Sequence, residues 1–203
     1  MVLHRPLNYV LRSWTHIAVL RALRDTATGF SGNQVARASG MTPRSAFLAL
    51  TALETLGLVR RQRGGREHLF TLNRSNQIVE HGIIPLLQLE GDLPERVGQE
   101  LRRLLQRRVV SAVLFGSTVR GDETPGSDLD LCCIVQDEAK RDAVRTALGK
   151  SARRLRETYG VGMAPIYLTV AEARRKRSSA LLKAIVSNGR LIAGKAIREV
   201  ISG

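Results

Sequence analysis

The sequence predicts a mixed α/β protein of the α+β kind, in which a helical domain ending in a β-hairpin precedes a second domain built on a mixed sheet. Three observations support this fold class. Apolar residues recur at helical spacing through the first half, up to a glycine pair between two strand patterns. Long helical patterns then alternate with β-branched, apolar strand patterns. Between these parts, residues 89–94 bring Gly, Asp and Pro together, and we therefore expect domains at 1–90 and 91–203.

Composition and charge narrow the classes of protein. The chain has 203 residues, 43% hydrophobic and 25% charged, which excludes a disordered, collagen-like or membrane-spanning protein. Its net charge of +14 makes nucleic acid or nucleotide phosphate the first partner to consider. The adjacent Cys132 and Cys133 suit neither a zinc site nor a disulfide framework, so we expect buried thiols in a reducing cytoplasm. Arg5, Pro6 and Arg12 interrupt the apolar residues of the N-terminus, so we expect no signal peptide, no membrane association and a cytoplasmic location.

The first half of the sequence has the pattern of three helices followed by a hairpin. Residues 17–24 carry the apolar stripe of a first helix, and Ser31 is a suitable N-cap for a second. Thr42 and Pro43 are typical of the start of a third helix, which continues at apolar helical spacing. A basic hairpin follows, in which Gly-Gly at 64–65 supplies a tight turn. Its two strand patterns cover residues 58–63 and 67–72.

This succession of helices and a basic hairpin, over residues 14–72, resembles the winged helix-turn-helix family. The resemblance implies that the helix at 43–56 lies in the major groove of double-stranded DNA, with Arg44 and Ser45 on its outward face. It also implies that the hairpin contacts phosphates or the minor groove through its arginines, Arg60, Arg61, Arg63 and Arg66. In the alternative, the domain is a protein-interaction module and these arginines form a solvated hairpin edge.

Two large apolar residues of the third helix, Phe47 and Leu48, depart from this pattern. If Ala46, Ala49 and Leu50 face the core, Phe47 and Leu48 occupy the outward face that should read base edges. They contact either thymine methyl groups or a protein surface, from a second subunit or the other domain. A homodimer is therefore one of the expected assemblies.

The second half contains two carboxylates at strand spacing. Asp128 and Asp130 lie in a strand pattern at 127–135, and because they are two residues apart their side chains point to the same face. Oxygen ligands in this arrangement suit a hard divalent cation such as Mg²⁺, which also binds substrate phosphates.

A phosphate-binding turn precedes these acids. The buried strand pattern at 109–115 runs directly into Gly116 and Ser117. Gly116 lets a phosphate approach the backbone closely, Ser117 adds a hydroxyl, and a helix starting there presents N–H groups to an anion. The sequence therefore predicts a phosphate site opposite a metal site.

Gly-Ser at 116–117, ten intervening residues and Asp-Leu-Asp at 128–130 resemble the nucleotidyltransferase superfamily related to DNA polymerase β, in its minimal, prokaryotic type. The likeness covers residues 93–203. The helix pattern at 93–107 opens it, and the later elements follow in the family's order at 137–159, 161–170 and 186–194.

The resemblance implies roles for particular residues. Gly116 and Ser117 would hold the terminal phosphates of a nucleoside triphosphate, and Asp128 and Asp130 would be the catalytic, magnesium-binding carboxylates. Arg120 would either touch the nucleotide phosphates or pair with an aspartate of its own loop, Asp122 or Asp128.

One expected group is missing from the sequence. Active members of the family usually carry a third carboxylate on the strand at 161–170, which here contains no acid. Glu172 follows that strand, where it fits the N-terminus of the next helix better than a metal site.

Two functions therefore remain open. In the first, the protein binds DNA and transfers a nucleoside monophosphate from a nucleoside triphosphate to a hydroxyl of a protein or small molecule. In the second, it is a transcriptional regulator whose nucleotidyltransferase fold has lost catalysis and senses nucleotide or serves as a scaffold. Because minimal nucleotidyltransferases resemble antitoxins that modify a separate helical protein, a protein acceptor is among the expected partners.

Overall fold

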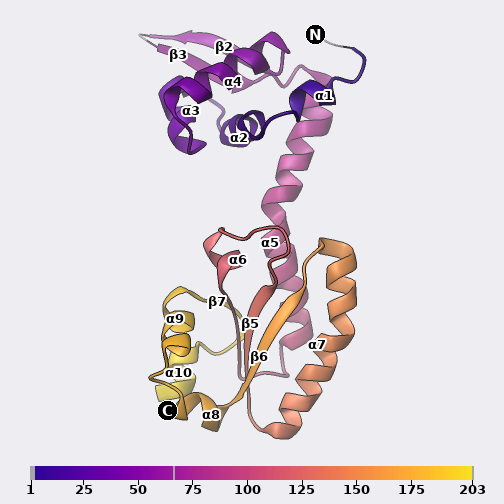
Figure 1. Ribbon diagram of the computed structural model, residues 1–203, viewed down its shortest axis with the longest axis vertical. Helices are drawn as coiled ribbons and strands as arrows, with labels where there is room; N and C mark the ends of the chain where they lie inside the picture. The colour runs from indigo at the N-terminus through magenta and orange to yellow at the C-terminus, as the bar shows by residue number, and fades with distance from the viewer. Residues whose placement is uncertain (1–2, 66, 203) are drawn as a thin grey trace. The chain divides into compact units, whose positions relative to one another are not determined.

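The computed structural model describes residues 3–65 and 67–202 (Figure 1). The chain divides into two compact units, residues 1–92 and 93–203. Arg66, one of the predicted DNA contacts, lies outside the described residues. Within the described ranges, no helix is both long enough and apolar enough to cross a membrane.

The first unit combines helices with a small antiparallel sheet. Strand order in the sheet is β1-β3-β2, so the hairpin β2–β3 gains a third strand that the sequence patterns did not predict. In chain order the elements are α1 (Leu7–Val10), α2 (Trp14–Leu23), β1 (Phe30–Ser31), α3 (Gly32–Ala38), α4 (Pro43–Thr55), β2 (Val59–Gly64), β3 (Glu67–Leu72) and the π-helix η1 (Val79–Ile83).

The caps of two helices in this unit follow the sequence prediction. Ser31 caps α3 in a capping box with Gln34, and the Thr42 hydroxyl accepts the Ser45 N–H at the start of α4, where Pro43 takes the first position. Leu50 and Leu53 of α4 are fully buried in the core between the helices and the sheet.

A single helix, α5 (Ile84–Leu105), runs through the predicted interruption at 89–94. Gly91 is needed for packing here, because a Cβ at this position would lie 2.9 Å from Nη1 of Arg24. The same Arg24 nitrogen donates to the Leu87 carbonyl at 2.8 Å. Arg21 binds the Glu90 carboxylate with two hydrogen bonds of 2.6 and 2.8 Å, and these lower the pKa of Glu90. The helix predicted at 93–107 is therefore the second part of a longer helix, and Pro94 lies inside it.

The second unit is built on a four-stranded mixed sheet of order β6-β5-β4-β7. Only the β5–β6 pair is parallel among the described strands of this sheet. After α5, the elements are β4 (Ser111–Phe115), α6 (Ser117–Arg120), β5 (Leu129–Val135), α7 (Glu138–Tyr159), β6 (Met163–Thr169), α8 (Val170–Arg175), α9 (Ala180–Asn188), β7 (Arg190–Gly194) and α10 (Ile197–Ser202).

Helices cover both faces of this sheet, with α7 on one side and α9 and α10 on the other (Figure 1). Alternate residues of β5 enter the two resulting cores: Leu131 packs toward α7, and Cys132 packs toward α9. The cysteines are buried, as expected, and burial raises the pKa of Cys132 to about 11 and that of Cys133 to about 12. Because β5 is central and buried on both faces, its N-terminal end is held in a fixed position.

Candidate functional site

Asp128 and Asp130 lie at the N-terminal end of β5. The strand begins at Leu129, so Asp128 directly precedes it, and the Leu129 N–H donates to the Gly162 carbonyl at 3.0 Å. Leu129 between them is buried, whereas Asp128 is exposed and Asp130 is half-buried. The two carboxylates are therefore presented at one edge of the sheet by a strand that is anchored through its apolar neighbours.

Gly116 makes room for the Asp130 carboxylate. In the register of β4 and β5, Phe115 pairs with Asp130, and a Cβ on Gly116 would overlap Oδ2 of Asp130. Gly116 also has a φ of +79°, a conformation that side chains rarely adopt. The structure thus brings these two predicted site residues into contact. Ser117 follows as the first residue of α6, whose first N–H groups have no partner within the helix.

A second glycine, Gly162, makes room for the Asp128 carboxylate. A Cβ at residue 162 would overlap Oδ1 of Asp128 and would lie 2.9 Å from Nη2 of Arg156. Gly162 is not among the residues predicted from the sequence, although its place directly before β6 is a signal, because a glycine beside a strand marks a close approach. The two carboxylates therefore each lie against a glycine, Asp130 against Gly116 just after β4 and Asp128 against Gly162 just before β6.

The neighbouring strand β6 contributes no acid to this edge. Its residue in register with Asp130 is Ala164, which is exposed. Across residues 3–65 and 67–202, no group of three or more His, Cys, Asp or Glu side chains is placed to hold a metal ion.

Glu172 has the structural role that the sequence predicted. It completes a capping box with Thr169 at the start of α8, beyond the opposite end of β6, and it forms an ion pair with Arg141. The Thr169 backbone N–H, which donates to this carboxylate at 2.8 Å, lowers the pKa of Glu172. The Glu172 carboxylate therefore caps α8 and pairs with Arg141, away from Asp128 and Asp130.

Arg120, predicted to touch phosphate or to brace its loop, pairs with Asp122. Its Nε donates to Oδ2 of Asp122 at 3.0 Å, and both side chains are more than half exposed. Exposed ion pairs of this kind contribute only about 0–1 kcal/mol to stability. Arg120 can therefore leave Asp122 at small cost and adopt another side-chain conformation.

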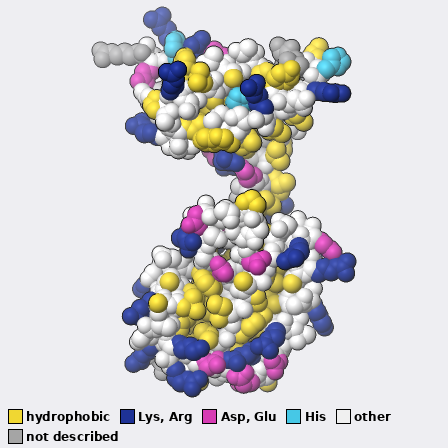
Figure 2. All heavy atoms as spheres, viewed as in Figure 1, with side chains coloured by type: hydrophobic (Ala, Val, Ile, Leu, Met, Phe, Trp, Pro, Cys, Tyr) yellow, Lys and Arg dark blue, Asp and Glu magenta, His cyan; other side chains and the backbone are white. Residues whose placement is uncertain are grey.

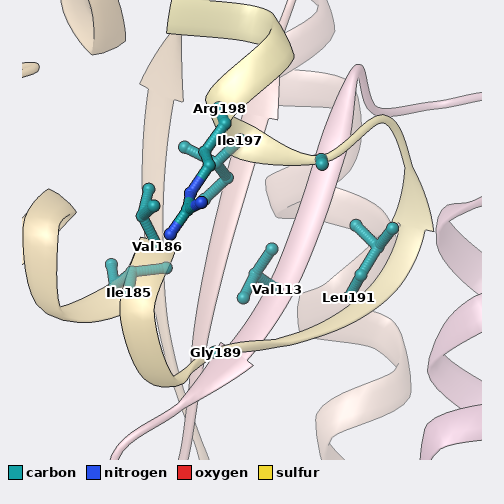
Figure 3. Close-up of a pocket in the computed structure, with 8 residues that line it drawn as sticks. Val113, Ile185, Val186, Gly189, Leu191, Ile197 and Arg198 are labelled. Carbon is teal, nitrogen blue, oxygen red and sulfur yellow. The ribbon is translucent and has the colours of Figure 1, made fainter.

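An apolar cavity in the same unit contains none of the predicted site residues. It has a volume of about 180 Å³ and lies where α9, β7 and α10 meet the sheet. Figure 3 shows Val113 of β4 on one side of it and Arg198 extending toward Ile185 and Val186. The predicted site residues therefore lie outside this cavity.

In the first unit, α4 presents the residues predicted on its outward face. Arg44 is exposed, whereas Ser45 is half-buried and its hydroxyl accepts from Thr42 at 3.0 Å. Phe47 and Leu48 are 55% and 61% exposed, so the predicted apolar outward face is present.

The hairpin divides its arginines between two faces. Along β2, alternation places Arg60 on the face opposite to Arg61 and Arg63, although all three are exposed. Arg60 lines a hollow with Arg74, whereas Arg61 lines another with Phe47 and pairs with Glu54 of α4 at 3.1 Å. Lys and Arg side chains are scattered over the visible faces of both units in Figure 2. One DNA backbone would therefore not reach all of the hairpin arginines from one side.

Comparison with known proteins identifies the second unit. Residues 95–191 match the family model described as "Nucleotidyltransferase domain". No curated protein matches the chain. A solved chain described as "Crystal structure of the toxin-antitoxin with AMP-PNP" is 18% identical, with a TM-score of 0.36, and the match covers 52% of this chain and 81% of that one.

Proposed function

We propose that the acidic edge of the second unit binds a magnesium–nucleoside triphosphate and transfers its nucleoside monophosphate to an acceptor oxygen, a hydroxyl of a protein or small molecule. The observation that carries the proposal is the cradle of Gly116 and Gly162 around Asp130 and Asp128. A Cβ on either glycine would displace the carboxylate beside it. The two glycines therefore leave the space that Asp128 and Asp130 occupy at the start of β5. The family match over residues 95–191 supports the same reading.

The residues present fit a magnesium ion. Two carboxylates supply hard oxygen ligands, and Mg²⁺ is usually held by one or two carboxylates together with substrate phosphates and water. Asp128 and Asp130 form no ion pair within the described part of the chain.

Each residue then has a defined task. Asp128 and Asp130 hold the metal, while the first N–H groups of α6 and the Ser117 hydroxyl bind the terminal phosphates. Bound magnesium supplies charge neutralisation to the triphosphate and the leaving pyrophosphate. Arg120 is placed to exchange Asp122 for a phosphate when nucleotide binds.

A specific observation favours a second candidate, a nucleotide sensor without catalysis. Ala164 occupies the position beside Asp130 where an acid of β6 would stand, so no described side chain there could take the proton of an acceptor hydroxyl. In this candidate the same residues bind nucleotide, and the second unit regulates the first.

Labelled nucleotide distinguishes these functions. The full-length protein is incubated with α-labelled nucleoside triphosphates, Mg²⁺ and cell lysate, beside the Asp128→Asn/Asp130→Asn variant. Label on a protein or small molecule with the wild type alone supports transfer. Magnesium-dependent nucleotide binding by calorimetry without labelled product supports the sensor, and equal binding by both proteins overturns the site.

For the first unit we propose a winged helix-turn-helix domain that binds double-stranded DNA. Exposed Arg44 at the start of α4 and the basic hairpin support it, together with the net charge of +14. Arg60, Arg61 and Arg63 are the proposed hairpin contacts, with Arg61 and Arg63 meeting the duplex from one face of β2 and Arg60 from the other. Arg66 and Ser45 complete the proposed set.

Salt dependence tests this proposal. Because phosphate contacts release counterions, DNA affinity should fall steeply with salt, and the four-arginine variant (Arg60, Arg61, Arg63 and Arg66 to Ala) should show a flatter dependence. An unchanged slope would show that the hairpin does not touch DNA. Absence of duplex binding at low salt would instead make the unit a protein-interaction module.

A further inference from the structure

Helix α7 carries an arginine in its last turn, Arg156, that forms no ion pair with any carboxylate of residues 3–65 and 67–202. The other four arginines of this fully described helix each lie within 4 Å of a carboxylate, whereas Arg156 does not. Its exposed side chain is therefore not committed to a surface ion pair. The four paired residues are Arg141, Arg145, Arg153 and Arg154.

The position of Arg156 is fixed by its neighbours. Leu155 is fully buried, and the Arg156 carbonyl accepts the Gly160 N–H at 2.9 Å where the helix ends with Gly160 at a φ of +71°. From this anchored backbone, Nη2 of Arg156 reaches the same point beside Gly162 that the Asp128 carboxylate reaches. A guanidinium thus lies at the β6 side of the acidic edge.

Arg156 places a positive charge where the strand β6 lacks a carboxylate. A site with three carboxylates can recruit a second metal ion, but β6 carries Ala164 and no acid at this edge. Arg156 supplies a fixed positive charge on the same side. The start of α6 and Arg156 also lie on opposite sides of the acids, because they accompany the two strands that flank β5.

We propose that Arg156 binds the α-phosphate of the nucleotide and provides the positive charge that a second metal ion would otherwise supply. This inference rests on the nucleotide-binding function proposed above. With the terminal phosphates at the start of α6, the triphosphate crosses Asp130 and Asp128, and its α-phosphate lies on the Arg156 side. Guanidinium groups suit this task because their N–H donors match phosphate oxygens and are always charged.

Calorimetry with ATP, and separately with inorganic pyrophosphate, tests the assignment in the full-length protein. The variants are Arg156→Gln and Arg156→Lys, with Arg153→Gln as the matched control, since it removes the same charge one turn earlier in the helix. Titrations are made at 0.15 M salt, where the Debye length of about 8 Å limits distant charge effects. Each is run with Mg²⁺ and with EDTA.

We expect Arg156→Gln to weaken ATP binding by about tenfold or more, as for loss of a charge-assisted hydrogen bond, with and without Mg²⁺. Arg156→Lys should recover part of this loss, and Arg153→Gln should bind as the wild type does. Pyrophosphate, which has no α-phosphate, should bind equally to all variants.

Each of the following results would overturn the inference. ATP affinity could be unchanged in Arg156→Gln, or could rise, which would mean that Arg156 only opposes metal binding by Asp128. An equal loss for ATP and pyrophosphate would assign Arg156 to general anion attraction. A purely structural role at the helix end would lower the melting temperature and leave ATP affinity intact. Failure of the wild type to bind ATP at all would instead refute the proposed function on which this inference rests.

Discussion

Substitution of Gly162 by alanine perturbs the candidate site through a single methyl group. Gly162 lies directly before β6, and the added Cβ would overlap the Asp128 carboxylate. The backbone there is not in the left-handed region, so alanine causes no strain of its own. Arg156 also lies close, at 2.9 Å from the Cβ, but the end of a long side chain moves at small cost. The short Asp128 side chain must therefore give way.

Gly162→Ala should change the affinity for magnesium–ATP much more than it changes the stability of the fold. Displacing a carboxylate from its rotamer costs about 0.5–1.5 kcal/mol. Alanine in place of glycine restricts the unfolded chain and returns about 0.4–1 kcal/mol. These effects nearly cancel, so the melting temperature should change little. Changing a residue that positions a metal ligand typically lowers metal affinity by about 10–100-fold, and this is the loss of magnesium–ATP affinity we expect when Asp128 holds the metal as proposed.

Calorimetric titration with magnesium–ATP and a thermal melt of the full-length protein measure the two quantities. Gly149→Ala is the matched control, because Gly149 is an exposed residue of α7 with nothing within 4 Å of the position of its Cβ. The control should gain up to about 1 kcal/mol of stability and bind ATP normally. In an Asp128→Asn background, Gly162→Ala should have no further effect, since both changes act on the same ligand.

If Gly162→Ala bound magnesium–ATP as tightly as the wild type does, Asp128 could move without loss of nucleotide binding. This result would refute the role of Gly162 in positioning Asp128. Additive losses in the double variant would also contradict it. A large fall in melting temperature with normal affinity would show that Gly162 serves the fold rather than the acidic edge.

Three further predictions concern residues other than Gly162 and Asp128. Glu172→Ala should lower the free energy of unfolding by about 1 kcal/mol, measured by urea denaturation, because the Thr169 N–H loses its carboxylate acceptor, and ATP affinity should stay constant. A loss of ATP affinity would make Glu172 the missing metal ligand. Because burial raises the pKa values of Cys132 and Cys133 above the ordinary 9.0, the unfolded chain loses these protons first, and the urea midpoint should fall as pH rises above about 9. That fall should be smaller in the double alanine variant, and an equal fall would contradict it. Phe47→Ser with Leu48→Ser should reduce self-association in sedimentation if a second copy covers them, or change DNA sequence preference if they contact thymine; no change in either would exclude both roles.

Local chemistry made part of this structure predictable from the sequence. Ser31 and Thr42 cap helices because their hydroxyls bond to the backbone a few residues away, and such contacts depend only on nearby residues. Glu172 at the start of α8 follows the same rule. The strand that contains Asp130 was predicted with an error of two residues in its start, so Asp128 precedes it, and the common facing of the two carboxylates stays a prediction.

Contacts between distant residues account for what the sequence did not predict. Gly91 has the appearance of a helix breaker, but the guanidinium of Arg24, far away in sequence, requires its missing side chain. Gly162 reaches Asp128 only because β5 and β6 pair in parallel across the long connection of α7. The division of the hairpin arginines between two faces was, in contrast, available from the alternation of β2 and was overlooked.

The parallel pairing of β5 with β6 also has a consequence for the order of folding. Strands β4 and β5 pair across a short connection, so Gly116 and Asp130 can meet early. Strand β6 follows the 22-residue helix α7, and its pairing closes a much longer loop. The contact between Asp128 and Gly162 therefore forms late in folding, after β6 has paired with β5. A nucleotide that needs both sides would bind only the fully folded unit, and at 100 times its Kd would stabilise that state by about 2.7 kcal/mol.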